Sequence, residues 1–353
     1  MCLALLLLIF SFNVSAQKTF KNPILPGFHP DPSICRVEND YYMVTSSFEW
    51  FPGLPIFHSK DLVNWEQIGH VLDRPSQLQM KDGLKASNGL WAPTIRYHQG
   101  TYYVICTATG CGGNFFVTAD SPEGPYSEPI FIKDAPGIDP SLFFDEDGTM
   151  WYCGSINGDN KIPPRRYPAE DRIYVQQLDP STGQFIGERH IVSSGYAINS
   201  PYAEAPHIYK IKGKYYLMIA EGGTWENHAV SVFTADNIVG PYTPFICNPV
   251  LTHRHLGNDI DITTIGHADL VQTQNGDWYS VMLGVRPVNG FNMLGRETFL
   301  TPVEFQGEQP IFNPGVGRVL MEEQFPKLPE CPVIKPDNRD CLLYTSPSPR
   351  DMR

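Results

Sequence analysis

The sequence predicts an all-β fold, a five-bladed β-propeller, from two observations: five copies of one internal repeat, and no segment with helical periodicity over a dozen residues. The 353 residues include 30 glycines and 32 prolines, and 42% of the chain is hydrophobic. This composition is typical of a globular protein that is rich in turns and has enough apolar residues for one large core.

Each repeat has the same order of features. A polar or acidic residue lies next to Pro or Ala, and a short apolar stretch, a turn with Gly, Asn or Asp, and a pair of aromatic residues follow. From the first residue to the first aromatic the offsets are 10, 10, 12, 11 and 10, and successive repeats start 61, 47, 65 and 64 residues apart. The five segments run from Asp31 to Tyr42, from Ala92 to Tyr103, from Asp139 to Tyr152, from Glu204 to Tyr216 and from Ala268 to Tyr279.

Each unit has enough apolar, β-branched residues for about four short strands, which is the content of a propeller blade. One blade cannot bury both of its faces, so blades pack around an axis and the first strand of each lines the central channel. A β-sandwich or a β-helix is the alternative, although a sandwich lacks a repeat of this length. We therefore expect Asp31, Asp139, Glu204 and the segment 267–269 to meet at one mouth of the channel, where three carboxylates suit acid–base chemistry.

The charge balance excludes two classes of partner. Asp and Glu number 38 against 26 Lys and Arg, which gives a net charge of −12 and a pI near 5.3. No basic surface is available overall to attract phosphate groups. We therefore expect no binding to nucleic acid or to anionic membranes.

The two ends of the chain differ from the rest. Residues 1–16 contain an apolar run and finish in Val14-Ser15-Ala16, which predicts a signal peptide and a secreted or periplasmic protein. The apolar run is too short for a membrane anchor. Residues 341–353 (CLLYTSPSPRDMR) resemble a translated sequencing adapter, which Cys341 to Ser346 match in frame, so we expect a non-native tail. The segment 17–320 is then the propeller, and the proline-rich segment 321–340 is a linker toward further natural sequence.

Seven short runs stand out along the chain: 28–33 (FHPDPS), 59–65 (SKDLVNW), 91–93 (WAP), 138–143 (IDPSLF), 204–207 (EAPH), 266–268 (GHA) and 294–298 (LGRET). In this order they resemble glycoside hydrolase family 43, and the resemblance extends from about residue 22 into the 320s. Two further runs, 47–53 (SFEWFPG) and 221–224 (EGGT), are most similar to the β-xylosidase branch of that family, some members of which also remove α-L-arabinofuranosyl groups.

The resemblance implies catalytic roles for the three carboxylates. Asp31 matches the general base, Glu204 the general acid, and Asp139 the residue that orients the acid and raises its pKa by like-charge repulsion. The family inverts the configuration at the reacting carbon, so the carboxyl groups of the base and the acid should stand about 6.5 to 9.5 Å apart.

The resemblance also implies substrate-binding residues. Arg296 matches an arginine that contacts the terminal sugar, Trp91 a pocket residue, and Phe48 and Trp225 are candidates for packing against a sugar ring. His267 matches a histidine at the centre of the channel, which in some relatives organises a divalent ion such as Ca²⁺ through waters and in others does not. No cofactor is required, and Ca²⁺ near His267 is left open.

These features together predict a secreted, inverting exo-glycosidase that removes β-1,4-linked xylosyl residues from the non-reducing ends of xylo-oligosaccharides. The first alternative is an α-L-arabinofuranosidase that acts on arabinoxylan or arabinan, with the same three carboxylates. The alternative from another class is a non-catalytic carbohydrate-binding propeller. Relatives in this branch continue into a C-terminal β-sandwich that helps to close the pocket, which we expect this truncated sequence to lack.

Overall fold

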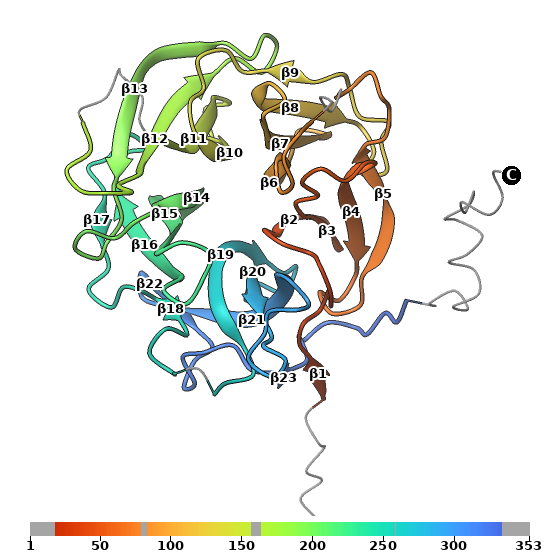
Figure 1. The fold of residues 1–353 in the computed structure, drawn as a ribbon, viewed down its shortest axis with the longest axis vertical. Helices are drawn as coiled ribbons and strands as arrows, with labels where there is room; N and C mark the ends of the chain where they lie inside the picture. Colours follow the sequence, from red (N-terminus) through yellow and green to blue (C-terminus); the bar gives the residue numbers. More distant parts are fainter. Residues whose placement is uncertain (1–17, 79–82, 157–163, 258, 334–353) are drawn as a thin grey trace, which may run out of the picture.

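Five antiparallel sheets surround one central axis, as Figure 1 shows in a view along the shortest dimension of the molecule. This computed structural model describes residues 18–78, 83–156, 164–257 and 259–333. Every regular element in those residues is a strand. The described residues contain no helix that is long and apolar enough to cross a membrane. The prediction of an all-β, five-bladed propeller is confirmed.

The blades follow one another along the chain. Blade 1 contains β2 (Ser33–Val37), β3 (Asp40–Val44), β4 (Gly53–Ser59) and β5 (Glu66–Leu72). Blade 2 contains β6 (Gly89–His98), β7 (Thr101–Thr109), β8 (Gly113–Ala119) and β9 (Ile130–Phe131). Blade 3 contains β10 (Ile138–Phe144), β11 (Met150–Ile156), β12 (Arg172–Leu178) and β13 (Phe185–Ser193). Blade 4 contains β14 (Glu204–Ile211), β15 (Lys214–Glu221), β16 (Ala229–Ala235), β17 (Thr243–Pro244) and β18 (Leu251–Thr252). Blade 5 contains β19 (Thr263–Gln272), β20 (Trp278–Val285), β21 (Glu297–Gln306) and β22 (Gln309–Phe312).

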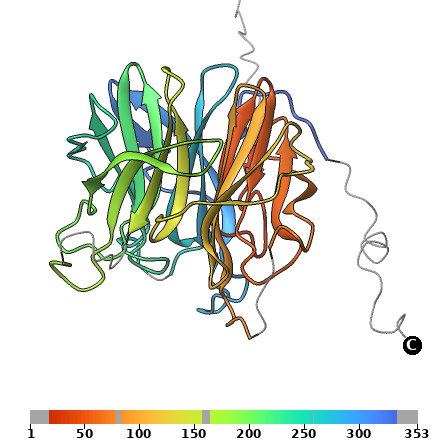
Figure 2. The same ribbon diagram turned by 90° about the horizontal axis from the view of Figure 1, so that it is seen from above.

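The first strand of each blade lies nearest the axis, as the repeat predicted. The inner strands β2, β6, β10, β14 and β19 contact one another in a closed circle, and the last strand of each blade lies at the outside (Figure 1). Figure 2 shows the blades from the side, with their strands running between the two faces of the disc.

Each pair of neighbouring blades encloses its own hydrophobic core. Five clusters of buried side chains lie between blades 1 and 2, 2 and 3, 3 and 4, 4 and 5, and 5 and 1. The paired aromatic residues of the repeat contribute to them, for example Tyr152 between blades 2 and 3 and Tyr216 between blades 4 and 5. The blades therefore depend on their neighbours for burial, as expected for a repeat that cannot bury both faces alone.

A short additional sheet joins segments from before the first blade and after the last one. Strand β1 (Thr19–Lys21) pairs antiparallel with β23 (Glu322–Gln324). The adjacent side chain of Asn22 is buried, and its Nδ2 donates hydrogen bonds to the carbonyl oxygens of Leu300 and Leu320 at 2.9 Å each. These contacts fasten the segment before blade 1 to blade 5.

The inner strands share a backbone irregularity at the repeat motif. In β6, β10, β14 and β19 two residues oppose a single residue of the next strand, which is a β-bulge. The first residue of each pair has a positive φ, between 44° and 54°, and Asp31 just before β2 has φ 55°. The five residues in this conformation are Asp31, Ala92, Asp139, Ala205 and His267. Non-glycine residues rarely adopt it, and such strained positions often cluster at functional sites.

The bulges correct one detail of the repeat alignment. Asp139 occupies the bulge position and Asp31, just before β2, has the same backbone conformation, but in blade 4 the bulge position belongs to Ala205. Glu204 lies one residue earlier and is equivalent to Trp91 in blade 2. The expectation that all three carboxylates hold the same place in the repeat was therefore wrong for Glu204, because strand pairing and not residue type fixes the position of the bulge.

Two residues after His267 in β19, a buried carboxylate connects four blades. Asp269 in β19 accepts hydrogen bonds from Ser33 Oγ of blade 1 at 2.6 Å, Arg96 Nη1 of blade 2 at 2.9 Å and Tyr209 Oη of blade 4 at 2.6 Å. Burial alone would raise the pKa of Asp269, but the charge and hydrogen bonds of Arg96 hold it well below its usual value. Burial lowers the pKa of His207 to about 3, so its neutral Nδ1 accepts from Arg96 Nη2 at 2.9 Å.

We predict that Asp269→Ala lowers the free energy of unfolding by about 3 to 5 kcal/mol, because it leaves the buried Arg96 charge without its partner. Urea denaturation of both proteins measures the difference. Asp236→Ala is the control, since the Asp236 side chain is 92% exposed, and it should change stability by less than about 0.5 kcal/mol. A loss at Asp269 no larger than the loss at Asp236 would contradict the proposed connecting role.

Candidate active site

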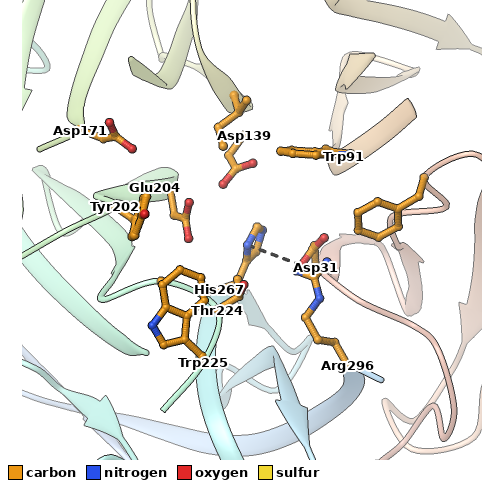
Figure 3. A pocket seen from close by; sticks show the side chains of 13 residues that line it. Asp31, Trp91, Asp139, Asp171, Tyr202, Glu204, Thr224, Trp225, His267 and Arg296 are labelled. Carbon is orange, nitrogen blue, oxygen red and sulfur yellow. Dashed lines mark hydrogen bonds and ion pairs between the residues drawn. The ribbon is translucent and has the colours of Figure 1, made fainter. Parts of the chain in front are cut away.

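A cavity of about 430 Å³ lies at the mouth of the channel where the inner strands carry their bulges. Figure 3 shows side chains from all five blades pointing into it. All eight residues predicted for the site line this cavity: Asp31, Phe48, Trp91, Asp139, Glu204, Trp225, His267 and Arg296. The predicted convergence of the three carboxylates at one mouth of the channel is therefore what the structure has.

Asp31 is held by contacts to both of its carboxylate oxygens. Arg296 Nη1 donates to Oδ1 at 2.6 Å and Ser46 Oγ donates to Oδ2 at 2.6 Å. Ser46 is itself fixed, because its Oγ accepts from the backbone N–H of Ala92 in blade 2 at 2.7 Å. A carboxylate that accepts bonds from a guanidinium and a hydroxyl, and still faces a cavity, is suited to act as a base toward water.

Asp139 acts on the Glu204 segment through the backbone. Its Oδ2 accepts a hydrogen bond from the N–H of Ala205, the residue after Glu204, at 3.1 Å. Burial raises the pKa of Asp139 to about 6, and the charge of His267 limits this increase while that of Asp31 adds to it. The orienting role that the resemblance implied thus has a physical route, since Asp139 fixes the peptide next to Glu204.

Glu204 lies in the opposite electrostatic environment to Asp31. The residue is 9% exposed, and among the described residues no side chain or N–H donates a hydrogen bond to its carboxyl group. Burial raises the pKa of Glu204 well above its usual value, and the charges of Asp139, Asp171 and Asp31 raise it further. These effects favour the protonated form of Glu204, which is the form that can give a proton to a leaving group.

Aromatic rings form one wall beside Asp31. Phe48 and Trp91 have ring centroids 6.2 Å apart, and Arg296 lies over the Phe48 ring with its Cζ 5.3 Å from the centroid. Trp91 Nε1 donates to the carbonyl of Ser87 at 2.7 Å, which fixes the indole. A planar apolar wall next to polar groups suits a sugar ring, which has an apolar face and hydroxyls around its edge.

His267 lies at the centre of the site, with Nδ1 3.9 Å from Asp31 Oδ1 (Figure 3). It offers one imidazole, and in the part of the chain that the structure describes no group of three or more His, Cys, Asp or Glu side chains is arranged to hold a metal ion. The residues present do not form a protein cage for Ca²⁺. We therefore derive no chemical step through a metal.

The sequence of this chain is similar to that of proteins with a known family. The family profile described as Glycosyl hydrolases family 43 matches residues 20–310. The chain belongs to glycoside hydrolase family 43. A protein named xylosidase/arabinosidase from Butyrivibrio fibrisolvens is 48% identical over 311 residues, which cover 88% of this chain and 59% of the relative.

Two further relatives have names that specify different sugars. A non-reducing end α-L-arabinofuranosidase of Bacteroides ovatus is 45% identical, over 93% of this chain and 60% of its own length. The solved structure of a xylan β-1,4-xylosidase from Bacillus halodurans is similar with a TM-score of 0.83 and 39% identity, over 90% of this chain and 61% of that chain. The chain thus spans about three fifths of the length of the relatives it matches.

Five other residues line the family 43 cavity that the sequence did not predict: Ile138, Asp171, Tyr202, Gly223 and Thr224. Ile138 could have been found, because it precedes the bulge of blade 3 as Trp91 precedes that of blade 2. Gly223 has φ 78°, and a Cβ there would lie 2.6 Å from the Trp225 ring, so only glycine lets that ring fold back beside the cavity. Asp171 and Tyr202 lie outside the repeat motif and gave no signal.

We predict that Asp139→Asn moves the basic limb of the pH profile of kcat/KM to lower pH. The amide can still accept from the Ala205 N–H, but it removes a negative charge beside Glu204, so the pKa of Glu204 falls. Glu204 works as an acid only while protonated, so activity is then lost at a lower pH. Initial rates measured across pH test this.

Asp147→Asn is the control for this pH experiment. Asp147 is an exposed residue in the turn after β10 of the same blade, so its loss should leave the limb in place. An Asp139→Asn limb that coincides with the parent limb would show that Asp139 does not raise the pKa of Glu204.

Proposed function

We propose that this protein is an inverting exo-glycosidase that removes β-1,4-linked xylosyl residues from the non-reducing ends of xylo-oligosaccharides. The observation that carries the proposal is the asymmetry of two carboxyls on one cavity. Asp31 accepts from Arg296 and Ser46, whereas buried Glu204 has a strongly raised pKa. An inverting hydrolase needs such a pair, one carboxyl to accept a proton and one to donate.

In the proposed reaction a water molecule lies between Asp31 and the anomeric carbon of the terminal sugar. Asp31 takes one proton from the water while the oxygen of the water bonds to the anomeric carbon. Glu204 gives its proton to the glycosidic oxygen as the bond between carbon and oxygen breaks, which releases the shortened chain with a new hydroxyl. Exchange of one proton with solvent then restores both carboxyls. Attack from the face opposite the leaving group gives a product of inverted configuration.

The relatives support this reaction class and leave the sugar to be decided. Names of relatives at 40% identity or more include xylosidase/arabinosidase, α-L-arabinofuranosidase and β-xylosidase. Arabinofuranosidase action on arabinoxylan or arabinan is therefore the second candidate, and the 45% identical Bacteroides ovatus protein favours it. A non-catalytic carbohydrate-binding propeller is the weaker alternative, because binding alone does not require a base, an acid and Asp139 together.

Two parts of the proposal depend on the sequence or on chemistry alone. Secretion to the periplasm or the medium stays a prediction from residues 1–16, which lie outside the described residues. Hydrolysis by Asp31 and Glu204 needs no metal, so dialysis against a chelator should leave kcat/KM unchanged. If added Ca²⁺ raises the activity, and His267→Ala abolishes that rise, a cation bound near His267 must be added to the proposal.

We predict that the first sugar released from xylobiose is α-xylose, which proton NMR detects before mutarotation. Glu204→Gln should lower kcat on xylobiose by about 10²- to 10⁴-fold, because the leaving sugar needs a proton. Its rate on dinitrophenyl β-xyloside should fall much less, because that leaving group departs without one. Glu146→Gln, at a side chain that is 81% exposed, is the control and should match the parent.

Other outcomes point elsewhere. Predominant cleavage of nitrophenyl α-L-arabinofuranoside would replace the xylosidase proposal by the second candidate. Early release of β-xylose would refute inversion. If the protein binds xylo-oligosaccharides and cleaves neither type of glycoside, the binding module becomes the better description.

A further inference from the structure

A fourth carboxylate, Asp171, lines the cavity on the side of Glu204 away from Asp31, as Figure 3 shows. It lies just before β12, and its side chain is only 3% exposed. Arg165 Nη2 donates to its Oδ1 at 2.7 Å, and no other described residue donates to this carboxylate. Arg165 is fixed in turn, because its Nε donates to the carbonyl of Glu170 at 2.9 Å. One oxygen of Asp171 is thus occupied and the other remains available as an acceptor.

The backbone holds Asp171 in register with the acid. The N–H of Tyr202 donates to the carbonyl of Ala169 at 2.9 Å, so the residue two before Glu204 is bonded to the residue two before Asp171. Ala169 and Tyr202 both have positive φ, 57° and 55°. Two strained residues on either side of one bond indicate that the relative position of these segments is closely determined.

The surroundings of Asp171 match a position for the leaving sugar. Asp31, Arg296 and Trp91 lie at the end of the cavity where the base lies, and the Phe48 ring packs against Trp91 and Arg296, so the sugar that is attacked belongs there. The proton of Glu204 goes to the oxygen between the two sugars, which places the second sugar beyond Glu204. Trp225 lies on that side, 47% exposed, and packs edge-to-face on Tyr202 with centroids 5.4 Å apart.

We propose that Asp171, positioned by Arg165, accepts a hydrogen bond from a hydroxyl of the leaving-group sugar and so selects substrates whose leaving group is a sugar. The inference rests on the proposed function, in that it assigns a residue to the second sugar of the same substrate. Asp171 then recognises a hydroxylated pyranose or furanose unit, while Trp225 offers an apolar surface to its ring.

The decisive experiment compares two substrates in Asp171→Asn. Arg165 can only donate, so the amide oxygen must face it and the amide NH₂ faces the cavity, which replaces an acceptor by a donor. We expect kcat/KM for xylobiose to fall about 10- to 100-fold, the usual effect of losing a hydrogen bond to a charged group. Asp171→Asn also removes a charge that raises the pKa of Glu204, so both substrates are compared at a pH below the basic limb of both proteins. There kcat/KM for nitrophenyl β-xyloside, whose leaving group has no hydroxyl to donate, should stay within about twofold. Unchanged nitrophenyl activity also shows that the variant is folded.

Glu226→Gln is the matched control, because Glu226 lies next to Trp225 and is exposed outside the cavity lining. It removes one charge nearby and should leave the ratio of the two substrates unchanged. Should Asp171→Asn fail to fold, Arg165→Lys gives the same test, since lysine keeps the charge but cannot hold both Asp171 and Glu170. The ratio of kcat/KM for xylobiose to kcat/KM for nitrophenyl β-xyloside should again fall.

Equal losses on both substrates, or no loss on either, would overturn the role of Asp171. Failure of the proposed function is seen separately, because the parent enzyme would then cleave neither xylobiose nor nitrophenyl β-xyloside. If the parent prefers arabinofuranosides, the same ratio is measured with an arabinobiose and nitrophenyl α-L-arabinofuranoside, and an unchanged ratio there also counts against Asp171.

Discussion

The ion pair between Asp269 and Arg96 at the axis sets the distances on which the rest of the site depends. Asp269 receives bonds from the inner strands of blades 1, 2 and 4, and those strands carry or follow Asp31, Trp91 and Glu204. His267 lies two residues from Asp269 on β19 itself. Blade 3 is connected by a different bond, from the Ala205 N–H to Asp139. A buried charge fully surrounded by donors is a fixed point, because any displacement would leave one of its partners unsatisfied.

Above that fixed point the chemistry arises from unequal compensation of charge. Four carboxyls line one small cavity. Asp31 is paired with Arg296 and Asp171 with Arg165, whereas Asp139 and Glu204 form no ion pair with a described residue. Burial disfavours the charged form of a carboxyl that has no ion-pair partner, which is why burial raises the pKa of both Asp139 and Glu204. In the proposed reaction, acid and base are therefore distinguished by their surroundings and not by residue type, since both are carboxylic acids.

Much of the fold and the core of the site could be predicted from the sequence because both follow the repeat. The Asp-Pro and Ala-Pro pairs mark the bulges, and residues at the same position in each repeat must lie at the same distance from the propeller axis. The sequence could not place Glu204 correctly within the bulge, because that depends on which residue of β15 it opposes. Asp171 and Tyr202 were missed for a related reason. Asp171 precedes β12 within blade 3, and Tyr202 lies in the connection from blade 3 to blade 4. Their relative position depends on the backbone bond between Tyr202 and Ala169, which no pattern of side chains records.

The five cores between blades have a consequence for how the protein opens. In an open array of repeats the two end units each have one neighbour and can fray independently. Here blade 5 packs on blade 1 as the others pack on theirs, so every blade has two neighbours and none is an end unit. Releasing any blade exposes two cores at once, and partial unfolding therefore costs nearly as much at one blade as at another. We therefore expect slow amide hydrogen exchange at similar rates in the inner strands of all five blades. This protection should be lost in all five blades together, in one cooperative unfolding transition.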